Sequence, residues 1–162
     1  MVRFSATIAA GIALASMLAT VSAAVLSSRA TEGELAFTKC NPSAQYPISA
    51  RSIRVSPSPP AFGGPIKITA VGDLASAIAQ GARAVVNAKI GPFSLKREID
   101  VCAESAESGL PCPIAPGPDK AISVTDTLPS LPIHNQNVGL TVNIYNADNT
   151  VLLCVNANIF VV

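Results

Sequence analysis

Apolar and polar residues alternate along most of this chain, and a period of two predicts β-strands with one buried face. After the turn signal Gly91-Pro92, the apolar residues Phe93, Leu95, Ile99 and Val101 occupy every second position apart from one arginine. Similar alternation elsewhere predicts eight strands, at 34–39, 50–56, 66–71, 82–90, 93–101, 121–127, 138–145 and 151–161.

Turn-forming residues separate these strands. The prolines and glycines of 57–65 predict a rigid connection, and 146–149 predicts a hairpin turn. A short polar loop is expected between Cys102 and Cys112, and the three prolines of 113–118 should prevent a regular ladder there. Residues 73–80 favour one helical turn of marginal length. Short strands without a long amphipathic helix predict one all-β domain, an antiparallel immunoglobulin-like β-sandwich.

The first 23 residues have the features of a secretory signal peptide. Arg3 supplies a positive charge, 4–21 is uncharged with an apolar core, and Val21-Ser22-Ala23 fits cleavage after a small residue. A retained membrane anchor is the alternative, but the stretch is barely long enough to span a bilayer. Removing 23 of the 162 residues would leave 139, with 24–33 as a flexible lead into a domain at 34–162. We therefore expect a secreted or vacuolar protein.

Charge argues against a nucleic-acid partner. Removal of Arg3 would reduce the 11 basic residues to 10, which equals the number of acidic residues. The longest basic run, Lys96-Arg97, is followed directly by Glu98, so no basic stripe is present. The middle residue of Asn41-Pro42-Ser43 is proline, so this triplet cannot accept an N-linked glycan.

Four cysteines in a secreted chain indicate two disulfides, with three possible pairings. We favour Cys102–Cys112, which closes a small loop and stabilises by about 3 kcal/mol, together with Cys40–Cys154, which ties the first strand to the last and is worth about 5 kcal/mol. Pairing Cys40 with Cys102 and Cys112 with Cys154 is the alternative, but it leaves the terminal strands untied.

Candidate catalytic residues do not form a recognisable site. His134, the single histidine, has no nucleophile elbow near any serine, and a solvated loop histidine is expected instead. The acidic residues Glu98, Asp100, Glu104 and Glu107 fit a solvated face better than a carboxylate pair. Neither CxxC spacing nor a glycine-rich phosphate loop occurs. We expect no enzyme, no cofactor and no metal.

The inward row of 82–90 consists mostly of alanine, and Ala70 is also small. Facing sheets normally lie about 10 Å apart with side chains filling the gap. Small inner residues either let the sheets approach or leave a space that an apolar ligand could fill. From the alanines alone, a thin and well-packed core is the commoner explanation.

Several segments, in this order, resemble the ML-domain lipid-recognition family, and most closely the fungal phosphatidylglycerol/phosphatidylinositol transfer proteins, relatives of the Niemann–Pick sterol carriers. They cover roughly 34–162 and are Val55-Ser56-Pro57, Pro59-Pro60, Ile66-Lys67-Ile68, Gly72-Asp73-Leu74, Ile78, Gly81-Ala82, Ile99-Asp100-Val101-Cys102, Cys112-Pro113-Ile114, Gly117-Pro118, Tyr145-Asn146-Ala147-Asp148 and Cys154. Some relatives have a third disulfide that this chain lacks, and the Cys102–Cys112 loop is longer than in the sterol carriers. These departures concern the ligand rather than the fold.

The resemblance implies a sandwich that opens slightly to hold a lipid tail between its sheets. It implies a monomeric carrier of phospholipid or sterol that contacts membranes transiently. By strand parity, the expected lining is Ile68, Val86, Ala88, Phe93, Leu95, Ile99, Val142, Ile144 and Val155, with Leu110, Pro113 and Ile114 at the rim. A compact sandwich that binds a protein partner at its rim is the alternative function.

Arg97 shares the inward parity of Phe93, Leu95 and Ile99. A cation at the cavity mouth could meet a lipid phosphate. A bulge that turns the side chain outward is the alternative. We take the mouth position as the hypothesis.

Overall fold

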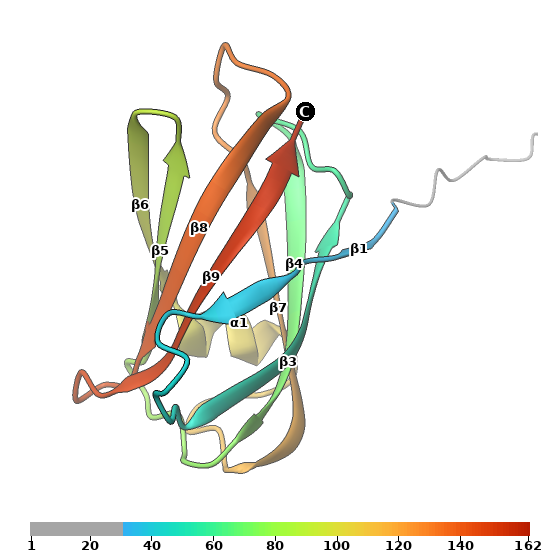
Figure 1. The fold of residues 1–162 in the computed structure, drawn as a ribbon. Coiled ribbons are helices and arrows are strands. Elements are labelled where there is room, and N and C mark those ends of the chain that lie inside the picture. The colour runs from blue at the N-terminus through green and yellow to red at the C-terminus, as the bar shows by residue number, and fades with distance from the viewer. Residues whose placement is uncertain (1–30) are drawn as a thin grey trace, which may run out of the picture.

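The computed structural model describes residues 31–162, so the expected signal peptide and most of the expected flexible segment lie outside the described part of the chain. Two antiparallel sheets face each other as a sandwich (Figure 1). One sheet has the order β1 (Gly33–Glu34), β3 (Ile48–Ser56), β4 (Pro65–Leu74) and β7 (Gly117–Thr127). The other has the order β2 (Phe37–Lys39), β9 (Val151–Val161), β8 (Gln136–Tyr145), β5 (Arg83–Ile90) and β6 (Phe93–Asp100). This architecture confirms the predicted all-β, immunoglobulin-like sandwich.

Inner rows of both sheets form the core in two clusters. The larger cluster gathers buried residues such as Ile48, Ile78 and Leu153 beside the single described helix, α1 (Val101–Glu107). The smaller cluster, around Ile90 and Val138, lies at the opposite end of the strands. The cavity described below lies between the sheets and shares several walls with the larger cluster.

The segment predicted as one strand at 34–39 is two strands in different sheets. Gly33 and Glu34 pair with β3, whereas Phe37–Lys39 pairs with β9. Leu35 still donates its N–H to the carbonyl of Ile53 at 2.8 Å before the chain crosses. Alternation fixes which face a residue takes but not which strand is its partner, so this crossing could not be read from the pattern.

The polar loop expected after Cys102 is a helix. The carboxylate of Asp100 accepts hydrogen bonds from the N–H groups of Cys102 (2.8 Å) and Ala103 (3.1 Å), which caps α1 and ends β6 one residue before the predicted boundary. Glu104 in the first turn is also favourable for a helix N-terminus. The prediction was wrong because a seven-residue helix gives too little periodicity to detect.

Two further local predictions were wrong. The helical turn expected at 73–80 is instead the end of β4 followed by Ile78, which exchanges backbone hydrogen bonds with Ile114 at 3.1 and 3.0 Å. Ile114 of that pair and the start of β7 at Gly117 both fall within the expected proline-rich bend at 113–118. Ile114 keeps its own N–H, and the missing donor of Pro118 is tolerated because β7 is an edge strand.

Two disulfides are present, and they are the favoured pairs. Cys40–Cys154 connects the end of β2 to β9 across 114 residues of sequence. Cys102–Cys112 connects α1 to the loop that leads into β7.

An apolar cavity as the candidate functional site

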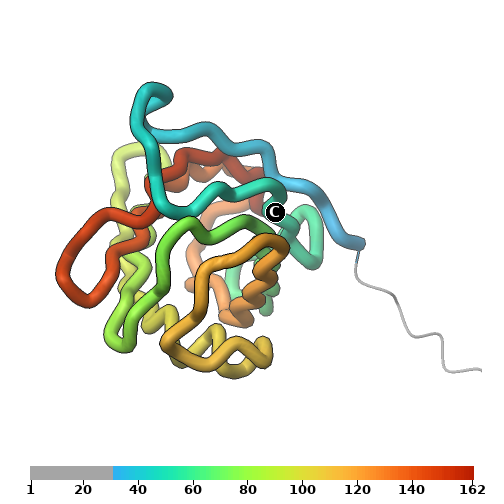
Figure 2. The backbone as a smooth tube through the Cα atoms, turned by 90° about the horizontal axis from the view of Figure 1, so that it is seen from below, coloured from blue at the N-terminus to red at the C-terminus, as the bar shows by residue number. Residues whose placement is uncertain are grey.

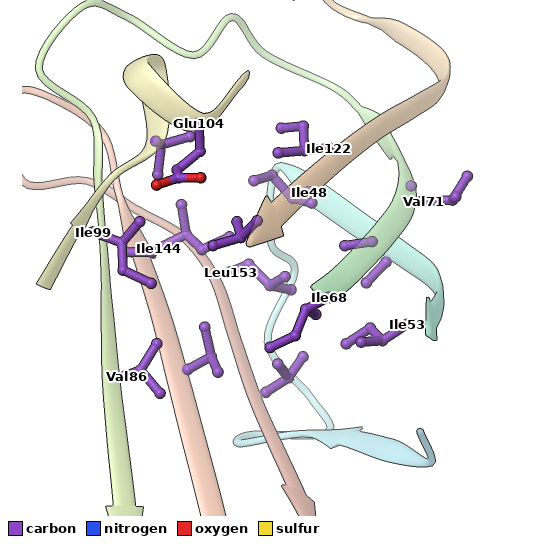
Figure 3. Close-up of a pocket in the computed structure, with 18 of the residues that line it drawn as sticks. Ile48, Ile53, Ile68, Val71, Val86, Ile99, Glu104, Ile122, Ile144 and Leu153 are labelled. Atoms are coloured by element: carbon purple, nitrogen blue, oxygen red, sulfur yellow. The ribbon is translucent and has the colours of Figure 1, made fainter. Parts of the chain in front are cut away.

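A cavity of about 230 Å³ lies between the two sheets, with α1 at one end (Figure 3). Nearly all of its wall is aliphatic, and both sheets contribute to it. The lining residues are Leu35, Ile48, Ala50, Ile53, Ile68, Ala70, Val71, Gly72, Leu74, Ile78, Ala84, Val86, Ile99, Val101, Glu104, Lys120, Ile122, Val124, Leu140, Val142, Ile144, Leu153, Val155 and Ala157.

Small residues explain why space remains at this level of the sandwich. Ala50 and Ala70 on one sheet and Ala84 on the other all border the cavity, so the opposing side chains do not reach each other. The thin packed core that the alanines alone favoured is therefore wrong here. Gly72 is small for another reason: a Cβ there would lie 2.7 Å from the carbonyl oxygen of Ser49, so close contact between β3 and β4 requires glycine.

Glu104 and Lys120 are the charged residues in the cavity wall. Figure 3 shows the Glu104 carboxylate pointing from α1 toward the cavity. Partial desolvation raises the pKa of this carboxyl, repulsion from Glu107, Asp126 and Asp100 raises it further, and Arg97 opposes the change.

The sandwich has two unlike long edges. Viewed along the strands, the N-terminal segment that holds β1 and β2 and the helix α1 lie on opposite sides (Figure 2). On the helix side, the edge strands are β6 and β7, which belong to different sheets. We call this side the open edge. Arg97 Nη1 of β6 and Asp126 Oδ2 of β7 form an ion pair across it at 2.9 Å.

Six of the predicted lining residues do border the cavity, and all six lie on inner strand rows. They are Ile68, Val86, Ile99, Val142, Ile144 and Val155.

Other predicted residues lie outside the cavity wall. Ala88 packs against the smaller core cluster. Phe93 and Leu95 have the expected inward parity, but they are 67% and 42% exposed, and they lie near one end of β6, the edge strand of its sheet (Figure 1). Arg97 is in the same inner row and follows no bulge, since β6 pairs with β5 without a register shift.

The predicted rim of Leu110, Pro113 and Ile114 is not at the cavity. Leu110 packs against the larger core cluster, Pro113 is exposed, and Ile114 is buried by its pairing with Ile78. The disulfide and this pairing fold the loop back onto the protein, which removes it from the opening.

Sequence reasoning missed most of the wall formed by β3, β4 and β7. Ile122 and Val124 occupy alternate positions of the strand predicted at 121–127, and that signal could have identified them as lining residues. Ile53 on β3 had a comparable alternation with Val55. Glu104 had no such signal, because the helix that aims it inward was not predicted.

Other site types find no support in the part of the chain that the structure describes. No helix between residues 31 and 162 has the length and hydropathy needed to span a bilayer. Histidine, cysteine and acidic side chains within the same residues form no group of three that could hold a metal ion.

Comparisons with known proteins identify the family. The model of the ML domain family matches residues 34–161. A protein of Cryptococcus neoformans var. neoformans serotype D named phosphatidylglycerol/phosphatidylinositol transfer protein is 33% identical over 131 residues, covering 78% of this chain and 70% of the relative. A protein of the same name from Emericella nidulans is 31% identical over 111 residues, covering 68% of this chain and 64% of the relative.

Among solved structures, a Niemann-Pick type C2 protein from the Japanese carpenter ant has a similar fold, with a TM-score of 0.60 at 12% identity. The match covers 78% of this chain and 99% of the ant protein. With the family model spanning nearly all of the described residues and the fungal relatives agreeing, this chain belongs to the ML domain family.

Proposed function

We propose that this protein is a non-enzymatic lipid carrier that holds the apolar tails of one lipid between its sheets and moves that lipid between membranes. The observation that supports this most directly is an almost wholly aliphatic cavity between the two sheets. A cavity of that kind loses contacts while it is empty, and an acyl chain would restore them. The names of the fungal relatives support phospholipid, either phosphatidylglycerol or phosphatidylinositol, as the ligand, with sterol as the second candidate.

Burial energetics suit exchange rather than permanent capture. Removing an acyl chain from water is worth about 0.8 kcal/mol per methylene, and both a bilayer and this cavity provide that gain. Because the two environments are similar, the lipid can move between them with little net change in free energy. Transient contact with a membrane surface is sufficient, and we propose that the carrier acts as a monomer.

The cavity must expand to hold a phospholipid. Its volume of about 230 Å³ lies below the range of about 300–1,000 Å³ that is usual for small-ligand pockets. We propose that the sheets separate at the open edge, because β6 and β7 share no strand pairing there.

The N-terminal sequence and the disulfides support a proposal for the compartment. We propose that residues 1–23 are removed as a signal peptide and that a domain at 34–162 acts in the extracellular space or the vacuolar lumen. Both disulfides fit such an oxidising compartment.

Mass spectrometry of lipid extracted from the purified protein, combined with transfer of fluorescent phospholipid between vesicles, tests the proposal. We expect stoichiometric phospholipid and measurable transfer. Protein that carries no lipid and takes up neither phospholipid nor sterol would contradict the carrier and support the protein-binding alternative.

A matched pair of variants locates the ligand. Ala84→Phe places a ring in the cavity and should abolish most lipid uptake. Ala121→Phe adds the same ring to β7, at an exposed position next to the cavity-lining Ile122. Because Ala121 has the outward parity of the strand, this variant should bind lipid normally. Equal uptake by the two variants would place the lipid elsewhere.

A further inference from the structure

The ion pair between Arg97 and Asp126 is unlike the other ion pairs of residues 31–162. Those of Arg51 with Asp73 and Asp119, and of Arg83 with Glu98, each connect strands or strand ends of one sheet. Arg97 and Asp126 connect the two sheets, at the edge where β6 and β7 are not paired with one another.

Both partners lie in the inner rows that form the cavity wall. Arg97 pairs across the ladder with Val86 and lies two residues from Ile99, and both neighbours line the cavity. Asp126 lies two residues from Val124, which lines the opposite wall. The side chains of Arg97 and Asp126 are 62% and 29% exposed. The pair therefore lies at the open edge, between solvent and the apolar interior.

The rest of the open edge is held by α1. Ser108, at the end of the helix, accepts a hydrogen bond from the N–H of Ser123 on β7 at 2.9 Å and also donates to the Ser123 carbonyl at 3.4 Å. Toward the hairpin tip, Phe93 and Leu95 are exposed. Arg97 and Asp126 thus link the two sheets directly between α1 and the tip of the β5–β6 hairpin.

We propose that this ion pair closes the opening of the empty carrier, and that the phosphodiester of an entering lipid displaces Asp126 and binds the Arg97 guanidinium. This inference rests on the proposed function. A guanidinium binds phosphate oxygens through parallel charge-assisted hydrogen bonds, as it binds a carboxylate. The exchange replaces one anion by another, so Arg97 keeps a partner in both states. A lipid without phosphate has no anion to replace the Asp126 carboxylate. It must either enter with the ion pair intact or break the pair without giving Arg97 a new partner.

Charge selectivity at the opening follows from the same arrangement. The carboxylates of Asp126 and Glu104 lie near Arg97 and repel an anion. A phosphate that displaces Asp126 therefore binds Arg97 against that repulsion, and only when attached to tails whose burial offsets it. Free inorganic phosphate has no tails and should not compete.

The test compares Arg97→Gln with Lys96→Gln. Lys96 is the adjacent residue of β6, exposed and of outward parity, so both variants lose one positive charge and only one loses it at the opening. Binding is measured for phosphatidylglycerol and for diacylglycerol, which has the same tails without phosphate. We expect Arg97→Gln to lose about tenfold in phosphatidylglycerol affinity, because the phosphate then meets the carboxylates of Asp126 and Glu104 without a neighbouring guanidinium. Diacylglycerol should bind at least as well as to wild type, because no ion pair has to be broken. Lys96→Gln should resemble wild type with both lipids.

Asp126→Asn should change phosphatidylglycerol affinity in the opposite direction from Arg97→Gln. It therefore separates closure of the opening, which needs both residues, from phosphate binding, which needs Arg97. It frees Arg97 and removes a repelling charge, so phosphatidylglycerol affinity should rise and loading should become faster. Millimolar inorganic phosphate should leave phosphatidylglycerol binding by wild type unchanged.

Each failure has its own signature. If wild type binds neither of these lipids and no sterol, the carrier function itself is wrong. If wild type binds phosphatidylglycerol and Arg97→Gln binds it equally well, or if inorganic phosphate competes through Arg97, the inference is wrong while the carrier stands.

Discussion

The two long edges of the sandwich are held together in different ways. At one edge, which we call the closed edge, residues 33–39 pass from β1 in one sheet to β2 in the other, so a single short segment joins both sheets covalently. Leu35 from this crossing lines the cavity, Phe37 packs against the larger core cluster, and Cys40–Cys154 anchors the end of the segment to β9.

At the open edge, β6 and β7 are linked by α1, by the Cys102–Cys112 loop and by one partly exposed ion pair. The exposed fraction of Phe93, on the inner row of β6, is 67%. Apolar burial and a covalent crossing therefore fix one side, whereas the other side depends on polar contacts that water can replace. This difference indicates that the closed edge acts as the hinge and the open edge as the entrance.

Removal of the closed-edge disulfide should have the largest effect on stability. Replacing Cys40 and Cys154 together by alanine frees a loop of 114 residues in the unfolded chain, which corresponds to about 5 kcal/mol. Urea unfolding measures the loss. A change below about 1 kcal/mol would show that burial of the crossing segment fixes this edge without the disulfide.

The open-edge disulfide should matter less for stability and more for exchange. Replacing Cys102 and Cys112 together by alanine opens a loop that spans only 10 residues in the unfolded chain. The expected loss in unfolding free energy is about 3 kcal/mol. Because this bridge fastens α1 at the entrance, lipid transfer between vesicles should become faster. Slower transfer by a protein that remains folded would place the entrance elsewhere.

Two phenylalanines, one at each edge, give a matched comparison. Phe37→Ala removes a ring packed against the core and should cost about 1–3 kcal/mol, less than a fully buried ring would. Phe93→Ala removes an exposed ring and should stay within about 0.5 kcal/mol of wild type. Thermal unfolding of the two variants in parallel measures both values. Equal losses would mean that the edges do not differ in packing.

Sequence patterns were sufficient for the sandwich because period-two alternation is a direct consequence of one-sided burial. The inner rows of β5, β8 and β9 were identified in this way, and Val86, Val142 and Val155 line the cavity as their parity required. Parity does not say whether a strand lies in the middle of a sheet or at its edge. Phe93 and Leu95 have the parity of lining residues and are exposed near one end of the edge strand β6.

The entrance depended on contacts that no local pattern encodes. The Arg97–Asp126 pair joins residues of different sheets, and the inward parity of Arg97 was visible without any sign of its partner. The crossing from β1 to β2 has the same alternation as one continuous strand. Predicting either feature from the sequence requires knowing which edges meet, and that is a property of the packed sheets.

The smallest predicted effect concerns Glu104, the carboxylate that faces the cavity from the open edge. Desolvation, with repulsion from nearby acids, raises the pKa of this group above its ordinary value of 4.5. A raised folded-state pKa means that the charged form destabilises the folded protein near neutral pH. That penalty is relieved as the pH falls through the raised pKa, and it is absent below the ordinary value. Glu104→Gln should therefore raise the melting temperature of lipid-free protein at neutral pH by a few degrees at most, and the difference from wild type should shrink steadily toward acidic pH. A difference that is constant with pH would mean that the carboxylate is fully solvated at an entrance wider than the structure shows.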